Sequence, residues 1–266
     1  MLLVNSGVAT TADALVPEVY LPERRGSLQA EILGSARRHD RIPYVIEPAV
    51  SALMRELMAG RPVLVLQNFG SRKHPSWHYA VVVGHVRKPE RFILRTGTTR
   101  RQTLAAERFV GTWRRSESWA MIVLQPGELP ADPAPMRYLQ AVSGLEAAQR
   151  WAAAARSYEA ATLRWPNEPL AWFGLANVQL AEGRFREAES GYRRVLQLAP
   201  GTIAARNNLA LLLSRRGCAA QARLEIDRAQ AAASGTAFAA EVADSAAEIR
   251  ARSSGGERSA SQCSEP

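Results

Sequence analysis

Apolar and small side chains recur in the second half of the chain at a fixed spacing of 34 residues. The pairs that keep this offset are Pro166/Pro200, Leu175/Leu209, Ala176/Ala210, Gly183/Gly217 and Ala188/Ala222. In each unit the small residues predict closely packed paired helices, the glycine predicts the turn between them, and the proline ends the second helix. The pattern therefore predicts an all-α array of helix pairs.

The order of these residues resembles the tetratricopeptide repeat, whose helix pairs stack into a solenoid. Alignment on Trp172 gives three units, at 135–168, 169–202 and 203–236. The first unit is degenerate, because Gln149 stands where the other two have the turn glycine. The resemblance implies a protein that binds peptide or protein partners.

The first half of the chain has a different pattern, in which predicted helices precede predicted strands. Helices are expected at 13–20, 27–39 and 47–58, with Ser27 as an N-cap and Glu47-Pro48 opening the third helix. Apolar runs predict strands at 62–68, 79–85, 91–96 and 120–124. Helices followed by an antiparallel sheet define an α+β domain.

Four prolines and one glycine fall between Gln125 and Pro135, so this stretch is expected to be a linker. The expected divisions are a first domain at 1–128, the linker at 129–135, the repeats at 136–252 and a disordered tail at 253–266. The repeat domain is expected to end in a capping helix that turns Phe238, Val242 and Ile249 inward.

A histidine opens one of the predicted strands of the first domain. The run GRPVLVLQN at 60–68 is followed by a polar loop and by WHYAVVVG at 77–84. This order resembles the papain-like cysteine peptidases of the bacteriocin-leader-processing type, over about residues 1–125. The resemblance implies that His78 is the general base of a catalytic site. The alternative is that His78 is an ordinary histidine at a strand edge.

A cysteine peptidase also needs a thiolate beside its histidine. In the resembling family that cysteine begins an N-terminal helix, and residues 1–7 resemble the end of this helix, so the chain is expected to start after the nucleophile. In the resembling family an aspartate orients the histidine. The position that corresponds to it here lies within residues 94–99, which hold no carboxylate. We therefore expect an inactive peptidase-like domain. The alternative is an active cysteine peptidase whose true start, with the cysteine, lies upstream.

The groove of the repeats is the expected binding site for a peptide or protein ligand. Template positions that face it are Phe173, Asn177, Leu180, Asn207, Asn208, Leu211 and Arg215. The asparagines resemble half of the clamp by which some relatives hold a C-terminal carboxylate, although Phe173 replaces its lysine. The alternative is that they are ordinary solvated helix residues. A third possibility for the protein is a structural scaffold, with the first domain as a dimerisation module.

Charge and composition add limits to these expectations. The net charge is +9 and its excess lies in the first half, but no recognised nucleic-acid module accompanies it, so nucleic-acid binding is not expected. Cys218 and Cys263 predict neither a disulfide nor a metal site, and no cofactor is expected. Without a signal peptide or a membrane-spanning run, a soluble protein is expected. The peptidase resemblance suggests the bacterial cell envelope.

Overall fold

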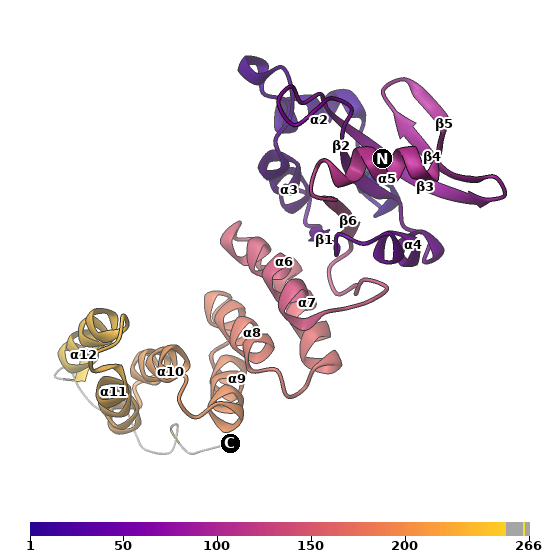
Figure 1. Ribbon diagram of the computed structural model, residues 1–266. Helices are drawn as coiled ribbons and strands as arrows, with labels where there is room; N and C mark the ends of the chain where they lie inside the picture. The colour runs from indigo at the N-terminus through magenta and orange to yellow at the C-terminus, as the bar shows by residue number, and fades with distance from the viewer. Residues whose placement is uncertain (254–262, 264–266) are drawn as a thin grey trace. The chain divides into compact units, whose positions relative to one another are not determined.

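The structure, a computed structural model, describes residues 1–253 and Cys263 (Figure 1). Its contacts divide the chain into two units, Met1–Ala153 and Ala154–Pro266. No helix in the described part of the chain is both long and apolar enough to cross a membrane.

Unit 1 combines short helices with strands. Its helices are α1 (Leu2–Asn5), α2 (Ala12–Val19), the 3-10 helix η1 (Pro22–Arg24), α3 (Gln29–Arg38), α4 (Val50–Met58), α5 (Ala106–Arg114) and α6 (Pro135–Ala147). Its strands are β1 (Ile42–Val45), β2 (Val63–Asn68), β3 (Trp77–Arg87), β4 (Glu90–Thr96), β5 (Thr99–Ala105) and β6 (Ala120–Leu124). The expected helices and antiparallel sheet are confirmed.

The strands form one antiparallel sheet in the order β1-β6-β2-β3-β4-β5. One face packs against α5, where the rings of Phe92 and Phe109 lie 4.3 Å apart. The opposite face packs against α1 and α3, through a cluster that includes Leu3, Ala36 and Met121. Helices therefore lie on both faces of the sheet, although almost all residues of the edge strand β5 are exposed.

Several details of unit 1 differ from the sequence expectations. Helix α3 begins after Leu28, which is extended and makes no side-chain cap, so Ser27 is not the N-cap. Helix α4 begins at Val50, two residues beyond the expected Pro48, because the residue before it is still extended. Strands β1 and β5 and helix α5 were not expected at all.

The segment that joins the sheet to α6 is held against α4. Buried Glu56 accepts hydrogen bonds from Arg61 Nε at 2.6 Å and from the backbone N–H of Ala131 at 2.8 Å. Arg61 also pairs with Glu128 at 2.9 Å. Helix α6 then packs against β1, with Tyr138 fully buried. The helix expected to open the first repeat thus lies in unit 1.

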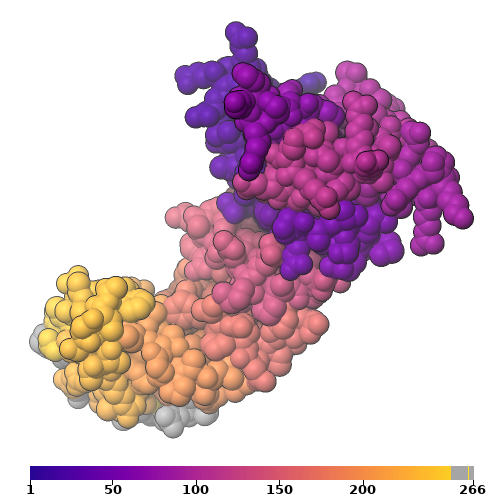
Figure 2. Space-filling model, viewed as in Figure 1, coloured from indigo at the N-terminus to yellow at the C-terminus, as the bar shows by residue number. Residues whose placement is uncertain are grey.

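Helix α7 (Trp151–Arg164) crosses the boundary between the units, and unit 2 continues with further helices. These are α8 (Pro169–Ala181), α9 (Phe185–Leu198), α10 (Ile203–Arg215), α11 (Ala219–Ala233) and α12 (Ala239–Ser253). In the space-filling view, α8 to α12 follow one another without a break (Figure 2). Buried residues from each of these helices form one hydrophobic cluster, which includes Ala176, Tyr192, Leu209, Ile226 and Val242.

The helices keep the 34-residue offset of the sequence. Helices α6, α8 and α10 begin at Pro135, Pro169 and Ile203, each 34 residues after the last. Three pairs related by this offset are buried in both units: Leu175/Leu209, Ala176/Ala210 and Ala188/Ala222. The turn glycines Gly183 and Gly217 both adopt positive φ, of 76° and 82°. The helical repeat is therefore confirmed.

The end of the chain corrects two expectations. Val242 and Ile249 of α12 are buried as expected, but Phe238 is 42% exposed because it precedes the helix and lies off its inward face. Cys218 and Cys263 form a disulfide, with their Cα atoms 5.5 Å apart. The expected disorder of 253–266 lies outside the described residues, apart from Ser253, which ends α12, and Cys263.

Candidate functional site

His78 is the one candidate catalytic side chain, and it lies inside β3, paired with Gln67 of β2. Its Nε2 is hydrogen-bonded to the hydroxyl of Thr96, the last residue of β4. The ring of Phe69 meets the imidazole edge-on at 5.9 Å. The structure thus places a threonine hydroxyl beside the imidazole. A neutral hydroxyl can orient an imidazole but cannot stabilise an imidazolium as a carboxylate does.

The sheet face that carries His78 is the one covered by α5. Alternation along the strands puts His78 on the same face as Gln67, whose Nε2 donates to Thr112 of α5 at 2.6 Å. Leu64, one of the residues that pack with α1, points to the opposite face. The only two cysteines of the chain are bonded to each other in unit 2. The described residues therefore supply no thiol for His78.

The expected groove of the repeats contains a small hydrogen-bonded network. Asn177 Oδ1 accepts a hydrogen bond from Tyr192 Oη at 2.8 Å and another from Asn208 Nδ2 at 3.2 Å. The second bond joins neighbouring helix pairs, because Asn177 lies on α8 and Asn208 on α10. The structure thus brings two of the expected groove residues together.

The other expected groove residues occupy different environments. Phe173, Leu180 and Leu211 are half-buried and pack against the repeat core, and Arg215 is exposed. Asn207 departs from the expectation of a groove-facing or solvated residue, because it is only 2% exposed. Its Oδ1 has no hydrogen-bond partner among the described residues. Asn207 therefore cannot contact a ligand on the open surface.

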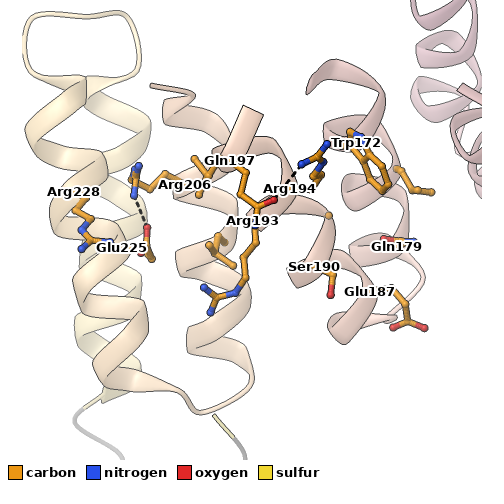
Figure 3. A pocket seen from close by; sticks show the side chains of 14 residues that line it. Trp172, Gln179, Glu187, Ser190, Arg193, Arg194, Gln197, Arg206, Glu225 and Arg228 are labelled. Carbon is orange, nitrogen blue, oxygen red and sulfur yellow. Dashed lines mark hydrogen bonds and ion pairs between the residues drawn. The ribbon is translucent and has the colours of Figure 1, made fainter. Parts of the chain in front are cut away.

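A pocket of about 860 Å³ lies on another side of these helices, and none of the expected groove residues lines it. Figure 3 shows its side chains, which come from α8, α9, α10 and α11. Four arginines contribute to its walls: Arg193, Arg194, Arg206 and Arg228. Leu175, Leu196, Leu209 and Trp172 provide apolar lining. Sequence reasoning missed this pocket, because its residues are scattered over four helices.

Two clusters of ion pairs hold most of these arginines. Glu225 pairs with Arg206 at 2.7 Å and with Arg228 at 2.9 Å. Glu189, which is 5% exposed, pairs with Arg193 at 3.0 Å and with Arg216. Each carboxylate therefore serves two guanidinium groups, so the side chains around the pocket carry an excess of positive charge.

Comparisons with known proteins find resemblance only among solved structures: no family model and no curated protein matches the chain. The Yersinia enterocolitica type III secretion translocator chaperone SycD is 15% identical, with a TM-score of 0.42 over 45% of this chain and 85% of that one. The TPR2B domain of yeast Sti1, in a complex with pHsp70, is 15% identical, with a TM-score of 0.42 over 44% and 97%. The TPR domain of P58(IPK) is 23% identical, with a TM-score of 0.40 over 44% and 33%. The repeat is established by the helix offsets rather than by these resemblances.

Proposed function

We propose that the repeats bind a peptide or a protein segment in the groove formed by α8 and α10. The observation that carries this proposal is the hydrogen bond between Asn208 and Asn177, which fixes both amides. No described residue bonds to Asn177 Nδ2 or to Asn208 Oδ1, so the two N–H donors of Asn177 and the carbonyl acceptor of Asn208 remain available. A peptide backbone offers the matching carbonyl and N–H groups.

The surroundings of the two amides suit a peptide side chain. Phe173, Leu180 and Leu211 are half-buried beside the core, so a ligand that covers them removes further apolar surface from water. The exposed guanidinium of Arg215 lies at the end of α10 and can receive a carboxylate. This combination favours an extended segment with at least one apolar side chain.

A screen of the full chain against immobilised random peptides tests the proposal. Peptides selected by the native protein should bind the Asn208→Ala variant about tenfold more weakly, because the amide that fixes the groove is lost. Gln197→Ala is the matched control, since Gln197 is exposed on α9 and lines the pocket instead. Absence of binders, or equal binding by the Asn208→Ala variant and the native protein, would contradict the groove proposal.

We further infer that residues 1–128 are a cysteine-peptidase-like domain that is inactive in this chain. The contact between His78 and Thr96 supports this, because it reproduces a histidine-orienting contact without the carboxylate. The full chain should neither hydrolyse peptides nor react with cysteine-directed peptidase probes at unit 1. Peptide turnover that disappears in His78→Ala would refute this inference. The alternative, an active product that carries the cysteine upstream, predicts activity restored by that longer form and abolished by His78→Ala.

A further inference from the structure

The pocket on α8 to α11 is a second surface of the repeats, separate from the groove proposed above. Successive residues of a helix point about 100° apart, so α8 presents Asn177 to the groove and Gln179 to the pocket. On α10, likewise, Asn208 belongs to the groove and Arg206 to the pocket. The two surfaces therefore use different side chains of the same helices, and each can be changed alone.

A buried amide in the wall of this pocket lacks a partner. Gln179 is 8% exposed, and its Oε1 makes no hydrogen bond to any described residue. A buried acceptor without a donor loses its interaction with water and gains nothing in return. Because Gln179 lines the pocket, a rotation of its side chain that brings Oε1 to an N–H group of a ligand would satisfy this atom.

Arg194 is a second group in the pocket wall whose hydrogen-bonding capacity is not used within the protein. Its contacts, to Gln197 Oε1, to the carbonyl of Pro166 and to Asn167 Oδ1, are all 3.4 Å long. That distance is beyond the usual range for N–H···O hydrogen bonds. No carboxylate of the described residues pairs with Arg194. Since guanidinium groups bind carboxylates through two parallel hydrogen bonds, Arg194 can hold an incoming anion.

We propose that this pocket binds an acidic peptide segment that also carries an apolar side chain. The arginines receive its carboxylates, Gln179 accepts a backbone N–H, and the lining of Leu175, Leu196 and Leu209 receives the apolar side chain. A nucleic acid fits the pocket less well, because Glu187 and Glu225 in its walls repel phosphate and the leucines offer no partner for it.

The test uses the full chain and a short fluorescein-labelled peptide of repeating Glu-Leu-Glu-Gly units, with binding followed by fluorescence anisotropy. We expect saturable binding that weakens as the salt concentration rises. A peptide with glutamine in place of glutamate, and an oligothymidylate of equal charge, should bind at least about tenfold more weakly. Equal binding of the glutamine peptide would overturn the role of charge, and tighter binding of the oligonucleotide would overturn the choice of ligand.

Variants locate the site. Arg194→Gln combined with Arg228→Gln should weaken binding of the acidic peptide by at least about tenfold. The matched control, Arg156→Gln combined with Arg186→Gln, removes the same charge from exposed positions outside the pocket and the groove, and should change binding by no more than about twofold. If the control weakens binding as much as the pocket variant does, the peptide binds elsewhere and the proposal is wrong.

Gln179→Met separates ligand binding from a structural role. It keeps the size of the side chain and removes the unpartnered acceptor, so the thermal melting temperature should stay the same or rise. Binding of the acidic peptide should nevertheless weaken by about threefold or more. Unchanged peptide binding would show that Gln179 faces no ligand and would overturn the placement of the peptide backbone.

Discussion

Alanine in place of the turn glycine Gly183 should destabilise the repeats through the backbone alone. Gly183 has φ of +76°, and a Cβ built there meets no atom within 4 Å, so no clash contributes. An L-residue in this left-handed region costs about 1–2 kcal/mol. Alanine also lowers the conformational entropy of the unfolded chain, and this offsets about 0.4–1 kcal/mol of that cost. The expected net loss in the free energy of unfolding is about 1 kcal/mol.

Gly201 provides the matched control for this substitution. A Cβ there also meets nothing within 4 Å, but Gly201 is not among the glycines with positive φ. Gly201→Ala therefore gains the entropy effect without the backbone penalty, and it should be neutral or stabilising by about 0.5 kcal/mol. Urea unfolding of the full chain, followed by far-UV circular dichroism, measures both variants. Equal effects of the two substitutions would refute the reasoning.

The degenerate turn offers the reverse substitution. Gln149 has φ of +56°, at the position where the other two units have glycine. Gln149→Gly removes the left-handed penalty but adds unfolded-chain entropy, so the net gain is about 0.5 kcal/mol. Stabilisation by Gln149→Gly together with destabilisation by Gly183→Ala would show that the turn geometry, rather than the local sequence, selects glycine. A loss of stability in Gln149→Gly would contradict this.

Three further predictions concern contacts within the described residues. Gly174→Ala should lower the free energy of unfolding by about 1–3 kcal/mol, because its Cβ would lie 2.3 Å from the ring of buried Tyr158; urea unfolding checks this. Glu189→Gln should destabilise by about 3 kcal/mol, because it leaves two arginines beside a neutral group, and thermal melting should show it. Thiol titration of the unfolded, unreduced chain should find no free thiol, because Cys218 and Cys263 are bonded.

The fold was predictable where local patterns determine it. The repeat could be read because small and apolar residues recur at fixed positions, and the structure buries them. Helix α5 was missed although Phe109 and Trp113, four residues apart, both lie on its buried face. Strand β5 was missed for a physical reason, since its residues are almost all exposed and carry no alternation. Strand β5 is defined by its hydrogen-bonded pairing with β4, and a single sequence does not show which strands pair.

The candidate sites were predictable only in part. His78 was singled out from a short run of sequence and its catalytic role stays a prediction; the structure adds that Thr96 contacts it. The burial of Asn207 could not be predicted from the sequence. A shift of one residue along a helix rotates a side chain by about 100°, so Asn207 and Asn208 point in different directions. The disulfide gave no signal either, since its cysteines are 45 residues apart and share no motif.

The arginine content of unit 2 has a structural cause that composition conceals. Buried or nearly buried carboxylates need partners, and Glu189 and Glu225 each take two arginines. Arg206 and Arg216 therefore join neighbouring helices, whereas Arg193 and Arg228 each pair with a carboxylate of their own helix. Arg194 differs, because its contacts are long and none of them is a carboxylate. A count of charges treats these residues alike, whereas their contacts show which of them pair with a carboxylate and that Arg194 does not.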